Sequence, residues 1–273
     1  KYSYSTKRKE KQMTVTKNPW NDILTKTDGD KKVIVAADDW EQIKDYLEQK
    51  NYQKTKEEYK LQLDVYPQHY VGNIKTAKII VLSKNPGYSE DFKNLYEDNK
   101  DYQQTCLNNL QLKENEVKFH AFDLDQGDKF GYWGKKFKQW FKVVKTNDDL
   151  KKYSSWFSEY VALAEYFPYH STQYDSKLDK SFNNKTSYLP TQQFLFNLIS
   201  KRIVDKDDSV TIIITRSYNK WYEAIPQLKE YKNCYETSNP SNPSLKPENL
   251  LKVKRYSAKK EVEKVLDDSL KKL

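Results

Sequence analysis

Two short apolar segments, KIIVLS at 78–83 and SVTIIITRS at 209–217, constrain the fold of this chain more than any other feature. A continuous run of branched apolar residues bounded by turn-forming residues is typical of a strand buried on both faces of a sheet. Two further strands are predicted at 116–124 and 233–238. Because segments of helical periodicity separate these strands, we predict an α/β fold, a three-layer sandwich with a central, mainly parallel sheet of four strands.

The rest of the sequence predicts three parts along the chain. Residues 1–30 are polar and are predicted to form an N-terminal arm, and 31–250 are predicted to form a single α/β domain. The tail, 251–273, has the apolar spacing of a basic amphipathic helix that packs on this domain.

Within the domain, helices are expected between the strands. The segment 31–50 predicts a short strand followed by a helix that Asp38 or Asp39 caps. Two more helices are predicted, over 148–166 and 189–204.

The charge balance points to an anionic partner. The 48 basic and 39 acidic residues give a formal net charge of +9, which favours nucleic acid, although much of this charge fits an ordinary mixed surface. No apolar run is long enough to span a bilayer, so we expect no membrane association. Cys106 and Cys234 lie far apart in the sequence and lack the spacing of metal ligands, so we expect neither a metal nor another cofactor. We expect both cysteines to be reduced thiols in a cytoplasmic protein.

Several common catalytic motifs are missing. The sequence contains no GxSxG, GxGxxG or GxxxxGK[ST] pattern, which argues against a nucleophile elbow, a dinucleotide fold and a P-loop. Asp123 and Asp125 could hold a divalent metal in a nuclease, but a solvated strand end explains this pair more simply.

The tetrapeptide NPGY at 85–88 ends the first buried strand abruptly. Pro86 fixes one backbone angle, and Gly87 permits a positive φ or the close approach of a ligand. Asn85 donates and accepts hydrogen bonds at once, so its amide could orient a water molecule and contact the edge of a base. Tyr88 adds an aromatic ring at the same position.

A second Asn-Pro-rich segment, SNPSNPSLKPENL at 238–250, follows the last predicted strand. Parallel strands place the loops after their carboxyl ends at one edge of the sheet, where ligands bind. We therefore expect the loops 83–91, 124–134 and 239–245 to meet in one cleft. The segment EYFPYHS at 165–171 adds Tyr169 and His170 as candidates for lining that cleft.

The two Asn-Pro segments together resemble the motifs of the uracil-DNA glycosylase superfamily. NPGY resembles the first motif, Gly-x-Asn-Pro-Gly, and NPSNPSL resembles the second, His-Pro-Ser followed by Pro. The likeness covers roughly 70–250, and it implies DNA, more than RNA, as the partner and hydrolysis of an N-glycosidic bond in DNA repair. It also implies that no metal is needed. The branches of the superfamily that hold an iron–sulfur cluster use four cysteines, and this chain has two.

The resemblance also implies roles for individual residues. Asn85 would position the attacking water, Asn239 would contact the base, and Ser241 would lie at a phosphate. Leu245 or Lys246 would lie near the wedge that fills the vacated stack. The aromatic residue that stacks on the base would be one of four rings: Tyr88, Phe122, Tyr132 and Tyr169.

The sequence departs from the family at two positions. Ser83 replaces the leading Gly of the first motif, and Asn239 replaces the His that stabilises the leaving base. A neutral amide lacks the charge of an imidazolium, so Lys84 or His170 would have to supply the cation. The alternatives are a catalytically silent nucleic-acid-binding or interaction module on the same fold, or another hydrolase that acts on a nucleotide.

Overall fold

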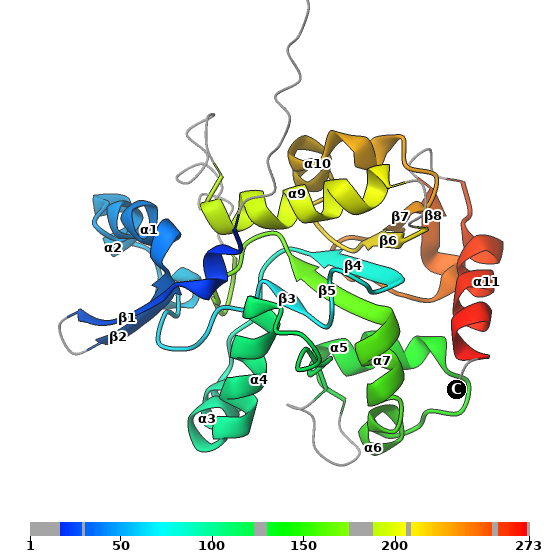
Figure 1. The fold of residues 1–273 in the computed structure, drawn as a ribbon, viewed down its shortest axis with the longest axis horizontal. Coiled ribbons are helices and arrows are strands. Elements are labelled where there is room, and N and C mark those ends of the chain that lie inside the picture. The colour runs from blue at the N-terminus through cyan, green and yellow to red at the C-terminus, as the bar shows by residue number, and fades with distance from the viewer. Residues whose placement is uncertain are drawn as a thin grey trace, which may run out of the picture.

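The computed structural model describes residues 17–28, 31–122, 130–174, 188–205, 209–252 and 256–271. They form a mixed α/β fold around a six-stranded sheet, with a two-stranded antiparallel sheet beside it (Figure 1). The six strands are β3 (Tyr70–Val71), β4 (Ile79–Ser83), β5 (Val161–Glu165), β6 (Thr211–Ile214), β7 (Cys234–Thr237) and β8 (Leu250–Lys252). The smaller sheet pairs β1 (Ile23–Asp28) with β2 (Lys31–Ala36).

The strand order of the large sheet is β3-β5-β4-β6-β7-β8. The four central strands are parallel, and β3 and β8 pair antiparallel at the two edges. Because β5 lies on one side of β4 and β6 on the other, the order reverses at β4. In such sheets ligands bind outside the carboxyl ends of the strands at this point.

The pairing of the four central strands confirms the predicted parallel centre, but the sheet has six strands rather than four.

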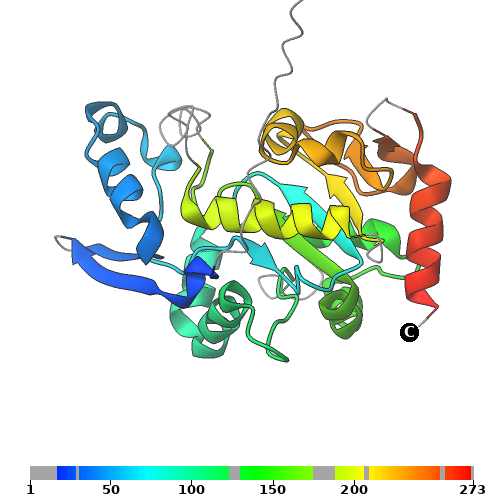
Figure 2. The same cartoon turned by 45° about the horizontal axis from the view of Figure 1, so that its top comes forward.

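Helices lie on both faces of the six-stranded sheet (Figures 1 and 2). One face is covered by α9 (Pro190–Val204) and α10 (Tyr218–Ala224), and the other by α5 (Tyr132–Phe137) and α7 (Ser154–Tyr160). The remaining helices are α1 (Trp40–Leu47), α2 (Lys50–Gln53), α3 (Glu90–Asp98), α4 (Lys100–Gln111), α6 (Asn147–Lys151) and α11 (Lys259–Leu270).

Two apolar cores lie on opposite faces of the sheet. Along β4, Ile80 and Leu82 belong to the core under α9 and α10, whereas Ile79 and Val81 belong to the core under α5 and α7. Alternate side chains of a strand point to opposite faces, so a strand between two cores must be apolar throughout. This requirement explains why 78–83 and 209–217 stand out in the sequence.

One predicted strand and one predicted helix were wrong. The segment predicted as a strand at 116–124 forms no strand over 116–122, and Asp123 and Asp125 lie outside the described residues. The predicted helix over 148–166 is instead α6, α7 and then the fully buried strand β5. The segment VALAE has no β-rich composition, and a short buried apolar run does not distinguish a strand from a buried helix.

Residues 17–28, predicted as part of a polar arm, form the 3-10 helix Pro19–Asn21 and strand β1. Trp20 is completely buried in the core beneath α9, and its indole N–H donates to His69 Nδ1 at 3.3 Å. This part of the N-terminus therefore belongs to the packed structure.

Neither Asp38 nor Asp39 caps α1 through its side chain. The buried carboxylate of Asp39 instead accepts hydrogen bonds from the backbone N–H and the hydroxyl of Thr191, at 3.1 and 2.6 Å, and from the hydroxyl of Tyr169 at 2.8 Å. Burial raises the pKa of Asp39 to about 6, and these hydrogen bonds limit the increase.

The C-terminal tail contains more than the predicted helix. Residues 250–252 form the edge strand β8, and the helix α11 covers Lys259–Leu270. Val262 and Leu266 are buried in the core on the α5 and α7 face, as the amphipathic pattern predicts. In the part of the chain that the structure describes, no helix has the length and apolar character needed to cross a membrane.

Candidate functional site

The carboxyl ends of β4, β5, β6 and β7 form one edge of the sheet, called here the carboxyl edge. Ser83 ends β4 and Glu165 ends β5, and the two are direct partners in the parallel register. Val81 and Leu163, two residues earlier in each strand, face α5 and α7, so the side chains of Ser83 and Glu165 lie on the same face. Arg216 follows β6 by two residues, and Asn239 follows β7 by two residues.

Tyr132, Lys136 and Arg216 form a cation–tyrosine cluster above this edge. Tyr132, on the first turn of α5, is 46% exposed. The Arg216 guanidinium lies 5.8 Å from the ring centroid, and Lys136 Nζ lies 5.3 Å from it. Burial and the nearby charge of Arg216 lower the pKa of Lys136. Two cations and an exposed ring suit a ligand that combines a negative charge with a flat ring.

A buried acid lies beside this cluster. Glu165 is 5% exposed, and its Oε2 makes no hydrogen bond among the described residues. Burial raises the pKa of Glu165 to about 8, against the opposing effects of hydrogen bonding to Ser83 and the charge of Arg216. At neutral pH the carboxyl is therefore mainly protonated and presents both a donor and an acceptor.

The second Asn-Pro loop lies against the same cluster. Arg216 donates to the carbonyl oxygen of Ser241 at 3.3 Å, and Lys136 Nζ donates to Asn242 Oδ1 at 3.0 Å. The exposed Asn239 uses Oδ1 to accept the backbone N–H groups of Ser241 and Asn242, at 3.0 and 3.3 Å. Its amide thus stabilises the turn that presents this loop.

The two residues predicted near the wedge lie differently from each other. Leu245 is completely buried, and its carbonyl oxygen accepts the indole N–H of Trp140 at 2.8 Å. Lys246 is exposed, and its backbone N–H donates to Gln139 Oε1 at 3.1 Å. Leu245 therefore anchors the loop to the core, whereas the side chain of Lys246 reaches solvent.

The loop of the first motif is fixed by the segment that follows β5. Asn85 Nδ2 donates to the carbonyl oxygen of Pro86 and to Ser171 Oγ, both at 3.0 Å. Pro86 is buried, and its carbonyl oxygen also accepts the Ser171 N–H at 3.3 Å. Gly87 is exposed and does not have a positive φ, and a Cβ added there would meet nothing within 4 Å. Packing within the described chain therefore does not require glycine at 87. The close approach of a ligand to the backbone is the remaining one of the two roles expected for it.

His170 lies beneath this loop as a neutral ring. It is 1% exposed, its Nδ1 lies 2.8 Å from the carbonyl oxygen of Gly87, and it stacks on Phe92 with 4.6 Å between centroids. Burial lowers the pKa of His170 to about 4, so it carries no charge at neutral pH. At neutral pH, His170 therefore does not supply the cation that the resemblance requires.

The other aromatic candidates occupy contrasting environments. Tyr169 and Phe122 are buried core residues, each 1% exposed. Tyr88 is partly exposed, but burial and the acids Asp64, Glu90 and Glu97 raise its pKa to about 12. An acidic surrounding disfavours a phosphate, so Tyr132 is the ring best placed for an anionic ligand.

On the α9 and α10 face of the carboxyl edge, two lysines share one ring. Lys84 Nζ lies 4.2 Å and Lys220 Nζ 5.6 Å from the ring centroid of Tyr174, and Lys220 also lies 5.9 Å from that of Tyr166. We call these four residues the paired-lysine cluster. Burial, and then the charge of Lys84, lowers the pKa of Lys220 to about 8, while Glu223 opposes the decrease.

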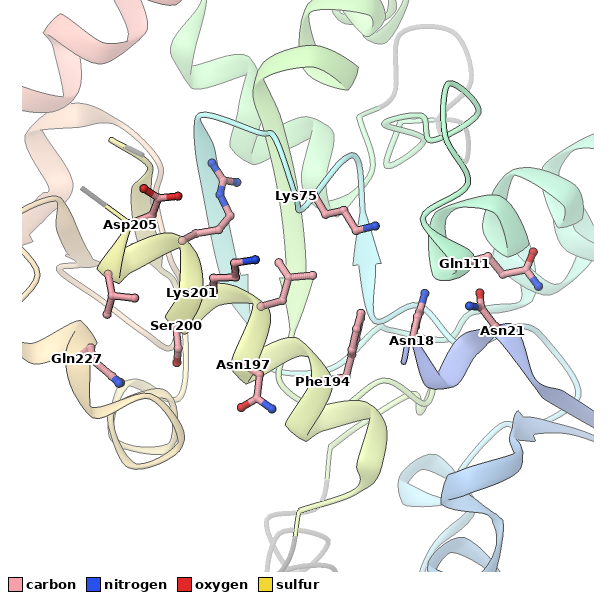
Figure 3. Close-up of a pocket in the computed structure, with 13 residues that line it drawn as sticks. Asn18, Asn21, Lys75, Gln111, Phe194, Asn197, Ser200, Lys201, Asp205 and Gln227 are labelled. Atoms are coloured by element: carbon pink, nitrogen blue, oxygen red, sulfur yellow. The ribbon is translucent and has the colours of Figure 1, made fainter. Parts of the chain in front are cut away.

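A large groove lies elsewhere, alongside α9 and next to the loop before β4 (Figure 3). Its volume is about 760 Å³, and its lining includes Asn18, Lys75, Asn197 and Lys201. Lys75 precedes the first residue of β4, so this part of the groove lies toward the amino ends of the parallel strands. The groove shares no lining residue with the clusters at the carboxyl edge.

The structure adds Arg216 and Glu165 to the residues that the sequence motifs indicated. Arg216 lies within the segment predicted as a strand, 209–217, but the strand β6 ends at Ile214, so Arg216 belongs to the loop at the carboxyl edge. Glu165 was not predicted at the carboxyl edge, because the segment that forms β5 was predicted as part of a helix. Among the described residues, no group of three His, Cys, Asp or Glu side chains could hold a metal, and Cys106 and Cys234 are both buried and form no disulfide.

Comparisons with family models, with curated proteins and with solved structures found no match to this chain. The site must therefore be interpreted from its own chemistry.

Proposed function

We propose that this protein binds nucleic acid, DNA in the first place, at the carboxyl edge, and that it belongs to the uracil-DNA glycosylase-like proteins. The observation that carries the proposal is the cation–tyrosine cluster, in which Lys136 and Arg216 flank the exposed ring of Tyr132. A base that stacks on tyrosine while cations contact its phosphate explains this arrangement. The order of the four parallel strands supports a ligand at the same edge.

The catalytic form of the proposal is hydrolysis of the N-glycosidic bond of a base flipped out of the stack. Asn85 would hold the attacking water, and Ser171 orients its amide by a hydrogen bond. Arg216, which contacts the Ser241 loop, would supply the positive charge that Asn239 lacks. A guanidinium stays protonated at every working pH, so it stabilises a leaving anion without a titration step.

The second candidate is a silent binding module on the same fold. The observation in its favour is Asn239, whose Oδ1 is engaged by two backbone N–H groups of its own loop. In this state the amide stabilises the loop rather than a departing base.

Single-turnover assays distinguish the two. Alkali-induced cleavage of a uracil-containing oligonucleotide measures excision, and we expect Asn85→Ala to abolish it and Arg216→Gln to slow it about 10²–10³-fold. Asn239→His should increase the rate. If neither the wild type nor Asn239→His excises a base while both bind the oligonucleotide, the silent module is correct.

A further inference from the structure

The paired-lysine cluster includes Lys84, the residue directly before Asn85, and its chemistry suggests a second reaction. Lys220 is in the first turn of α10, which begins just beyond β6, and Lys84 is the first residue after β4. Both amines therefore lie at the carboxyl edge, at the strand pair where the order reverses. Lys84 Nζ lies 4.2 Å from the ring centroid of Tyr174, and Lys220 Nζ lies 5.6 Å from it.

A half-buried lysine beside a second cation is the usual setting for an amine nucleophile. The aromatic rings of Tyr166 and Tyr174 exclude water from one side of Lys220, and Lys84 opposes a second positive charge. Both effects favour the neutral amine, which has a free electron pair. Lysines of this kind react with aldehydes and ketones to form Schiff bases.

The geometry points to Lys220 as a nucleophile that forms a Schiff base with the aldehyde of a base-free deoxyribose. The inference rests on the proposed function, because the abasic sugar is the product of base excision and its open-chain form carries an aldehyde at C1′. Lys84 acts through Lys220, as a positioning residue that keeps the amine neutral.

The step balances without an added oxidant or reductant. The Nζ electron pair of Lys220 attacks C1′, the C=O π electrons move to oxygen, and a proton passes from nitrogen to that oxygen. The carbinolamine hydroxyl then takes a proton from solvent and leaves as water, and the nitrogen electron pair forms a carbon–nitrogen double bond in place of the carbon–oxygen bond. The product is a protonated imine that holds the protein on the damaged strand.

The test uses the full chain, an oligonucleotide with a preformed base-free site, and sodium cyanoborohydride, which reduces an imine to a stable amine. We expect a crosslinked product on a denaturing gel, attached at Lys220 by mass spectrometry. Lys220→Arg keeps the charge and should reduce the crosslinked fraction about tenfold or more, because guanidinium is not a nucleophile at this pH.

Lys229→Arg is the matched control. Lys229 also lies over one tyrosine, 6.0 Å from the ring centroid of Tyr222, but it is exposed. Its replacement should leave the crosslink unchanged. Lys84→Gln should shift the pH profile of crosslinking to higher pH, a change that a structural role for Lys84 would not produce.

Binding of the same oligonucleotide without reductant separates this inference from the proposed function. If the DNA binds but no crosslink forms, or if the crosslink persists in Lys220→Arg, the inference is wrong and the proposed function stands. If the DNA does not bind, both are wrong. Thermal unfolding of each variant shows whether a lost crosslink reflects a lost fold.

Discussion

Tyr132 combines solvent exposure with contacts to two cations, and this combination makes it the most informative single residue. Replacing it with Ala removes the ring on which a base would stack, which costs about 1–3 kcal/mol of binding free energy for single-stranded nucleic acid. Because Tyr132 is 46% exposed, the free energy of unfolding should change by less than about 1 kcal/mol. Fluorescence anisotropy with a labelled oligonucleotide measures the first quantity, and urea unfolding the second.

Tyr256→Ala provides the matched control for Tyr132→Ala. Tyr256 is an exposed tyrosine before α11, and 69% of its surface is accessible. Its loss should leave affinity unchanged. Equal losses of affinity in both variants would mean that Tyr132 has no special role in binding.

The buried carboxyl of Glu165 should contribute less to the free energy of unfolding at pH 8 than at pH 6.5. Its folded-state pKa of about 8 is above the ordinary value of 4.5, so the folded protein holds a proton that the unfolded chain has lost. The stability that Glu165 contributes therefore falls as the pH rises from 4.5 toward 8, by about 1.5 kcal/mol over the part between 6.5 and 8. Glu165→Gln, which cannot ionise, lacks this contribution, so between pH 6.5 and 8 the wild type should lose about 1.5 kcal/mol of stability relative to the variant.

The comparison of wild type with Glu165→Gln isolates Glu165 from the other shifted groups. Burial lowers the pKa of His69 to about 3, and those of His120 and His170 to about 4, from an ordinary value of 6.5, so each adds stability as the pH rises through 6.5, with the opposite sign. The lowered pKa of Lys220 likewise adds stability as the pH approaches and passes 8. These contributions are common to both proteins. Urea unfolding of both proteins at pH 6.5 and 8.0 measures the difference between them; an equal change in wild type and Glu165→Gln would show that Glu165 does not titrate in this range.

At the scale of elements, two glycines test how the sheet and its loops constrain the chain. Gly72 follows β3 with a φ of +85°, and a Cβ there would lie 2.4 Å from the carbonyl oxygen of Val161 in β5. A Cβ on Gly87 would meet nothing within 4 Å. Gly72→Ala should therefore lower the free energy of unfolding by more than about 2 kcal/mol, and Gly87→Ala by less than about 0.5 kcal/mol.

The same pair of variants also reports on ligand approach. If nucleic acid contacts the backbone of the first motif, Gly87→Ala should weaken DNA binding although it leaves stability intact. Urea unfolding and anisotropy together measure both effects. Comparable destabilisation by the two substitutions would contradict the observed loop geometry.

The sequence predicted two strands that are buried on both faces and rich in branched residues. The segments 79–83 and 211–214 are strands near the positions expected from their apolar runs, and 234–237 is a strand within the segment predicted at 233–238. The strand 161–165 was missed because Ala, Leu and Glu favour helix and the preceding residues are helical. The edge strands β3 and β8, with two and three residues, are too short to produce a sequence pattern.

The same limits explain what could be predicted of the site. The sequence motifs predicted that Asn85 and Asn239 lie at the carboxyl edge, because each follows a parallel strand by two residues. Glu165 and the partners of Tyr132 depend on which strands are neighbours, and that information is tertiary. The buried positions of Leu245 and Tyr169 likewise follow from packing that no local pattern contains.

At the scale of the whole molecule, the net charge of +9 is spread over many exposed lysines, so charge alone does not locate a binding surface. We propose more specifically that the carboxyl edge, and not the groove alongside α9, contacts phosphates. Each side offers a pair of basic residues for replacement. Lys136 and Arg216 lie at the carboxyl edge, and Lys75 and Lys201 line the groove.

The most direct test is the salt dependence of single-stranded DNA binding in these two double variants. For the wild type, the logarithm of the binding constant should fall linearly with the logarithm of salt concentration, because bound cations displace counterions. Lys136→Gln with Arg216→Gln should reduce that slope by about 1.4, since each lost contact contributes about 0.7 with a single strand. Lys75→Gln with Lys201→Gln should leave the slope unchanged. No binding at low salt, or a slope reduced only by the groove variant, would contradict the account.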